Sequence, residues 1–113
     1  MLDNNTVVIY GWKVDGDTES DFQQELYNFD EDYFDKYQDI FVEDTMCGNY
    51  IYFGAILAQY DADEGGEVII NSNLIDKATS KYNKIIKDNP KLNKILSEYK
   101  EGEPQLYVFQ NIW

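Results

Sequence analysis

Hydrophobic and polar positions along the chain follow strand-like and helix-like patterns in turn. Residues 6–14 (TVVIYGWKV) are β-branched or aromatic on both alternating sets, which is typical of a central strand, and Asp15-Gly16-Asp17 then signals a turn. Strand-like segments follow at residues 49–60, 67–71 and 105–113, and residues 40–43 form a shorter candidate. Within 49–60, the run Ala55-Ile56-Leu57-Ala58 also leaves a helix open. These segments predict four or five β-strands.

The first stretch with helical spacing lies between residues 18 and 39. Thr18 is a suitable N-cap with Asp21 three residues on, and Asp30 can end the helix and cap a second one. The apolar positions follow steps of four, three, four and four along one helical face: Phe22, Leu26, Phe29, Tyr33 and Tyr37. The pattern predicts an amphipathic helix, either whole or broken near Asp30.

The second helical stretch starts at Asn73, which is a suitable N-cap with Asp76 at the third position. Its expected inner face consists of Ile75, Ala78, Tyr82, Ile85 and Ile86, and its outer face of Lys77, Lys81, Lys84 and Lys87. Asn89-Pro90 favours a fresh helix start, with proline at the first position. This helix is therefore expected to be kinked or double, and to end before Gly102.

The order of these segments predicts an α+β fold. Residues 1–113 form a single domain, with a four- to five-stranded, mostly antiparallel sheet and two helical segments packed on one face. Among known topologies, the ferredoxin-like split βαβ arrangement fits this order best. Fold analogy of this kind carries no information about activity.

Charge is distributed unevenly along the chain. Of the 22 acidic residues, 17 lie in residues 1–72 together with two of the nine lysines, and the formal net charge is −13. Such a surface is expected to meet a partner of opposite sign, and it argues against direct binding to nucleic acid or to an anionic membrane. No apolar run is long enough for a membrane span.

Residue types that are missing narrow the chemistry further. The chain has no histidine, which excludes Ser-His or Cys-His catalysis, and all nine cations are lysines. Its only cysteine, Cys47, cannot form an internal disulfide, so a reducing, cytoplasmic location is expected. No catalytic residue, metal or cofactor is assigned, and the protein is expected not to be an enzyme.

The most unusual segment is residues 15–44, which carries twelve carboxylates and one cation, Lys36. Acids recur there at steps of three and four, next to aromatic residues. The residues predicted to contact a partner are Asp21, Glu25, Asp32, Asp35, Asp39, Tyr33, Phe34 and Tyr37. A row of carboxylates on one helical face can occupy the cations that a nucleic-acid-handling protein uses for phosphates. The competing interpretation is a solvated face of an acidic protein.

Two further groups of acidic residues are candidates for metal binding or catalysis. The loop 61–67 (DADEGGE) has the D-x-D start of an EF-hand loop but lacks its ligands at positions five and twelve, which favours a polar turn. A small carboxylate or metal-dependent enzyme remains the third hypothesis, although Glu98-Tyr99-Lys100 falls at a helix end, where the nuclease E-x-K pattern is not expected.

Together these features favour a non-enzymatic inhibitor that binds a basic nucleic-acid-binding protein or nuclease by phosphate mimicry. In size, acidity and aromatic content the chain resembles, as a class only, the small anti-defence proteins of phages, such as anti-CRISPR and anti-restriction proteins. The alternative is an immunity protein that neutralises a basic bacterial nuclease toxin, because a negative helix in a positive cleft would serve either role.

Overall fold

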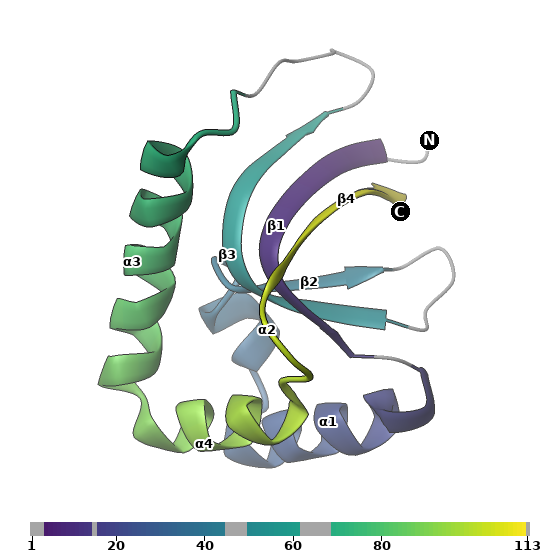
Figure 1. The fold of residues 1–113 in the computed structure, drawn as a ribbon. Helices are drawn as coiled ribbons and strands as arrows, with labels where there is room; N and C mark the ends of the chain where they lie inside the picture. The colour runs from purple at the N-terminus through teal and green to yellow at the C-terminus, as the bar shows by residue number, and fades with distance from the viewer. Residues whose placement is uncertain (1–3, 15, 45–49, 62–68, 113) are drawn as a thin grey trace.

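The computed structural model describes residues 4–14, 16–44, 50–61 and 69–112 (Figure 1). In chain order the elements are β1 (Asn4–Val14), α1 (Gly16–Phe29), α2 (Tyr33–Lys36), β2 (Phe41–Asp44), β3 (Tyr50–Asp61), α3 (Ser72–Asp88), α4 (Pro90–Tyr99) and β4 (Gln105–Ile112). The four strands form one antiparallel sheet in the order β2-β3-β1-β4. The predicted α+β class is confirmed.

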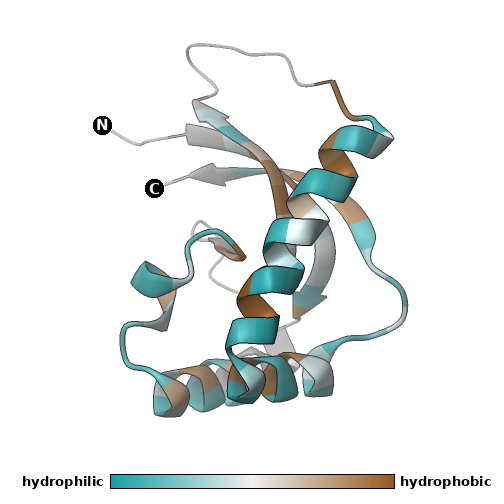
Figure 2. Ribbon diagram, turned by 90° about the vertical axis from the view of Figure 1, so that its left-hand side faces the viewer, coloured by the Kyte–Doolittle hydropathy of each residue, from teal (hydrophilic) through white to brown (hydrophobic). Residues whose placement is uncertain are grey.

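The strand order is that of two interleaved βαβ units. β3 lies between β1 and β2, and β1 lies between β3 and β4, so each unit has a strand of the other inserted into it. The helices form an L: α3 stands beside the sheet over β3, and α4 lies next to α1 across one end (Figures 1 and 2). The connection between β1 and β2, through α1 and α2, therefore packs against the end of the connection between β3 and β4, which is α4.

The two central strands bend sharply, and a pair of glycines makes the bend possible (Figure 1). Gly11 of β1 lies opposite Gly54 of β3, and a Cβ on Gly11 would come within 2.1 Å of the carbonyl oxygen of Phe53. Gly54 has φ +141°, a conformation that other residues rarely adopt. The register also shifts between Val8 and Ile9. Only glycine at both positions lets the two backbones approach this closely.

The main core lies between the sheet and the helices. Its buried residues are Val14, Phe22, Leu26, Tyr33, Ile40, Phe41, Ile51, Phe53, Ala55, Tyr82, Leu92 and Leu96. Phe22 of α1 joins the layers, since its ring centroid lies 5.5 Å from that of Phe53 in β3 and 4.6 Å from that of Tyr99 in α4. The inner faces expected for both helical stretches do face the core: Phe22, Leu26, Tyr33 and Tyr82 are buried, and the other expected positions are half-buried.

A second, smaller cluster lies on the other face of the sheet. Val7, Ile9, Val42 and Tyr52 are buried there, and the ring of Tyr52 stacks on Phe109 of β4 with centroids 4.1 Å apart. Because the sheet bends, side chains of β3 and β4 meet across this face. The prediction that the strands are apolar on both faces is explained by these two clusters.

Three local predictions were wrong. Residues 69–71, expected to complete a strand, are not strand, and Ile69 remains 71% exposed. α3 begins at Ser72 because the side-chain oxygen of Asn71, and not that of Asn73, accepts a hydrogen bond from the backbone of Leu74 (2.9 Å). α1 begins at Gly16, so Thr18, which was predicted as its N-cap, lies inside the helix, and α4 begins at Pro90 as expected.

Candidate acidic interaction surface

The acidic stretch forms two short helices, because the chain turns at Asp30. The carboxylate of Asp30 accepts a hydrogen bond from the backbone of Asp32 (2.9 Å) and pairs with Lys36 Nζ (2.7 Å), and its backbone oxygen accepts one from Tyr33 (3.0 Å). The hydrogen bond from Lys36 holds the pKa of Asp30 below its ordinary value. The break predicted at Asp30 is therefore confirmed, but the N-cap of α2 is Asp32 and not, as predicted, Asp30.

On α1, two of the predicted acids lie on the side that faces α4. Tyr99 of α4 forms a hydrogen bond with Glu25, which, with burial and the nearby charges of Glu25 and Asp21, raises the pKa of Tyr99 to about 12. The second carboxylate oxygen of Glu25 is buried and has no hydrogen-bond partner among the described residues. Glu25 is thus half-buried and engaged by its own fold, whereas Asp21 is exposed.

The last of the predicted acids, Asp39, lies beside α3. Its carboxylate is 3.3 Å from Lys81 Nζ, and both side chains are 62% exposed. An exposed pair of this kind is weak, but it reduces the free charge at this point. The expected single row of carboxylates is therefore corrected: the turn at Asp30 divides it between a flank near α4 and a flank near α3.

Three of the carboxylates outside these ion pairs, Glu31, Asp32 and Asp35, lie at the corner between α1 and α2, and Asp21 lies further back on α1, on the flank near α4. Asp21, Glu31, Asp32 and Asp35 are exposed, and within the part of the chain that the structure describes the ion pairs of this region are Asp30–Lys36 and Asp39–Lys81. Lys36 and Lys81 are thus engaged in ion pairs, whereas the exposed Lys91 of α4 lines a pocket with Phe29 at the end of α1. Because the exposed acids outnumber this one lysine, the corner is net negative.

The predicted aromatic contacts contribute more to the core than to the surface. Tyr33 is only 7% exposed and packs edge-on against Phe41, so it cannot serve as a surface anchor. Phe34 and Tyr37 are half-buried against the core, and the Tyr37 hydroxyl donates to Asn89 Oδ1 (3.1 Å) at the junction of α3 and α4. The reason is that aromatic residues at helical spacing in so small a domain are needed for packing.

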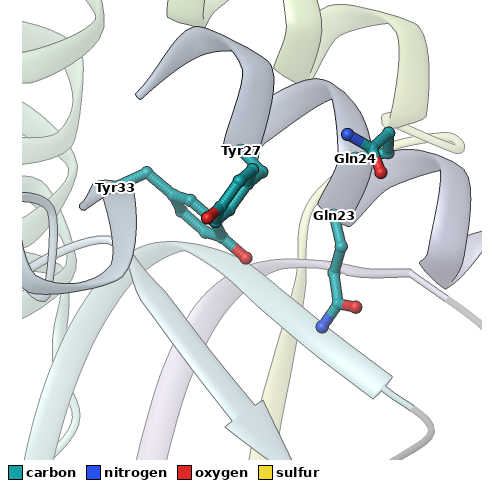
Figure 3. Close-up of a pocket in the computed structure, with 4 residues that line it drawn as sticks. All are labelled: Gln23, Gln24, Tyr27 and Tyr33. Carbon is teal, nitrogen blue, oxygen red and sulfur yellow. The ribbon is translucent and has the colours of Figure 1, made fainter. Parts of the chain in front are cut away.

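Sequence reasoning missed Tyr27, which is 54% exposed and presents the large aromatic surface of this region. It lies with Gln23, Gln24 and the buried Tyr33 around an open pocket of about 480 Å³. Figure 3 shows the two tyrosine rings next to each other and Gln23 extending from α1 beside them. Gln24 donates to Asn28 Oδ1 (3.0 Å) on the outer side of the helix. Its exposure could have been predicted, because Tyr27 does not lie on the helical face formed by the other apolar residues of α1.

No cluster of three metal-ligating side chains occurs among the described residues, and the candidate loop at 61–67 lies largely outside them. The four lysines on the outer side of α3 are exposed as expected: Lys77, Lys81, Lys84 and Lys87. Among the helices described, none has the length and apolar content that crossing a bilayer requires.

Comparisons with protein-family models, with curated proteins and with solved structures gave no match to this chain.

Proposed function

We propose that the protein is a non-enzymatic inhibitor that places the α1–α2 corner in the cationic groove of a nucleic-acid-handling protein. The observation that carries the proposal is the group of exposed carboxylates Glu31, Asp32 and Asp35 at the corner, with the exposed Asp21 further back on α1, while the neighbouring Lys36 is engaged with Asp30. A groove built to hold phosphates presents lysines and arginines to such groups. The corner can neutralise such cations.

The rigidity of the corner supports the proposal. The Asp30 side chain fixes the turn, and the Tyr37–Asn89 hydrogen bond ties the end of α2 to the junction of α3 and α4. Exposed carboxylates on a fixed scaffold lose less conformational freedom on binding than carboxylates on a disordered acidic segment. Tyr27, exposed on the same helix, offers an aromatic face to a partner's cation.

Charge also affects the rate of capture. With a net charge of −13, the protein is attracted to a basic partner over distances of about a Debye length, roughly 8 Å at physiological salt. The same properties suit either an anti-defence protein or an immunity protein for a nuclease toxin. The identity of the captured partner decides between these two roles.

The test is capture from a host lysate with matched charge-reversal variants. Asp21→Lys, Asp32→Lys and Asp35→Lys are combined in one variant, which leaves the internally bonded Glu25 intact. The control combines Asp76→Lys, Glu101→Lys and Glu103→Lys, three exposed acids outside α1 and α2, so that the net charge changes by the same amount.

The wild-type protein and the control variant are expected to capture the partner, and the corner variant is expected not to capture it. An oligonucleotide added in excess should release the partner from the wild-type protein. Both variants are checked for an unchanged urea midpoint. Equal capture by the two variants would exclude the corner as the contact, and a captured protein with no nucleic-acid groove would refute the proposed class.

A further inference from the structure

The edge strand β4 has no charged residue in a chain that is otherwise 27% charged. Residues 105–113 read QLYVFQNIW, and within the described sheet β4 pairs with β1 alone. Proteins usually protect an edge strand with lysine, proline or inward-pointing charges, since an open edge can pair with another chain. No charge provides such protection along β4.

β4 is also apolar on both of its faces. Tyr107 and Phe109 point to the smaller cluster and pack on Tyr52. Leu106 and Val108 point to the opposite, helix-facing side, since they pair with Tyr10 and Val8 in β1, yet they remain 46% and 62% exposed. The helix on that side, α3, lies over β3 and leaves β4 uncovered (Figure 1).

The other two long strands with apolar residues on both faces, β1 and β3, are central and have a neighbour on each side. A doubly apolar strand belongs to the interior of a sheet, because each face and each edge is then covered. β4 has this composition but stands at an edge. Its pattern indicates a neighbour that a single copy of the chain does not supply.

We propose that the open edge of β4 pairs, antiparallel, with β4 of a second copy of this chain. A basic partner would find no carboxylate on this strand, whereas a second copy presents the same uncharged, apolar edge. Antiparallel pairing of a strand with itself generates a two-fold axis, so that each copy contributes the same groups. Val108 and Leu106 would then be covered across that axis.

This dimer leaves the acidic corner accessible. β4 forms one edge of the sheet, β2 forms the other, and α1 and α2 precede β2 in the chain. Since the net charge of each copy is −13, the two copies repel each other, and salt relieves this repulsion. Added salt should therefore strengthen self-association, the opposite of its effect on capture of a basic partner. Failure of one proposal is thus distinguishable from failure of the other.

The experiment is sedimentation equilibrium of the full chain at several protein and salt concentrations. Val108→Lys and, separately, Leu106→Lys put a like charge on the pairing edge of both copies, close to each other across the two-fold axis, and are expected to weaken dimerisation by about tenfold or more. The matched control is Ile69→Lys, which replaces an exposed apolar residue outside β4 and should leave dimerisation unchanged. Circular dichroism confirms that each variant is folded.

A wild-type protein that stays monomeric at all concentrations and salts would overturn the proposal. Dimerisation that Val108→Lys and Leu106→Lys leave as strong as in the Ile69→Lys control would overturn it equally, because the contact would then lie elsewhere on the surface.

Discussion

Replacing Gly11 with alanine should lower the free energy of unfolding substantially, because it disturbs the bent sheet. The new Cβ would lie 2.1 Å from the carbonyl oxygen of Phe53 and 2.8 Å from the Cα of Gly54. These are backbone atoms of the neighbouring central strand, which cannot move aside as the end of a flexible side chain can. Relief requires a change in the β1–β3 ladder itself, on which both hydrophobic clusters depend.

The expected cost is at the upper end of the range for overpacking, about 3 kcal/mol. A domain of this size has a stability of about 5–15 kcal/mol, so the variant should remain folded but with a clear loss. With a urea m-value of roughly 1–3 kcal/mol/M, the unfolding midpoint should fall by about 1–3 M. Fluorescence of Trp12, which stacks on Phe53 at a 5.5 Å centroid distance, reports the transition.

Gly102→Ala is the matched control. Gly102 also has a positive φ (+69°), but its Cβ would meet no atom within 4 Å. Only the backbone strain remains there, about 1–2 kcal/mol. If Gly11→Ala lowers the urea midpoint no more than Gly102→Ala does, the close approach of β1 and β3 is not what the glycine pair provides.

Three further changes test the local contacts. Tyr37→Phe removes the hydrogen bond to Asn89 and should lower the free energy of unfolding by about 1 kcal/mol in urea titrations. Asn71→Ala removes the N-cap of α3 and should cost about 1 kcal/mol, measured in the same way. Tyr99 has a pKa of about 12 in the folded protein, above its ordinary value of 10.0. Its contribution to the free energy of unfolding is therefore complete below pH 10 and is lost as the pH rises to 12. In Tyr99→Phe this alkaline loss should disappear, because the variant has no hydroxyl to bond with Glu25.

Each of these changes has a control. Tyr27→Phe alters an exposed tyrosine and should leave the urea midpoint unchanged, unlike Tyr37→Phe. Asn73→Ala lies inside α3 and should cost nothing or stabilise slightly, since alanine favours the helix interior. A larger loss from Asn73→Ala than from Asn71→Ala would contradict the assigned cap, and an identical alkaline pH profile for Tyr99→Phe would contradict the role of Tyr99.

Much of the fold follows from periodicity. The doubly apolar runs at residues 6–14 and 49–60 are the central strands because the sheet is packed on both faces. Periodicity fails where a segment's neighbours decide its state. Ile69 and Ile70 have strand propensity but no described strand beside them, and Asn71 and Asn73 are equally good caps by residue type.

The acidic surface was harder to predict because its geometry depends on one turn. Steps of three and four define a row only on a continuous helix, and the Asp30 side chain ends that helix by binding Asp32 and Lys36. The residue types gave no indication that Glu25 would bond with Tyr99 or that Asp39 would meet Lys81. The first pair depends on how α1 packs against α4, and the second depends on how α3 packs against the sheet.

In the proposed function, exposed carboxylates of the α1–α2 corner guide the protein into a cationic groove. This is tested by the association rate constant with the captured partner as a function of salt, for the corner variant and its charge-matched control. We expect a steep fall with salt for the wild-type protein and the control, and a rate slower by roughly tenfold or more with a weak salt dependence for the corner variant. Equal rates and equal salt dependence for the two variants would contradict it.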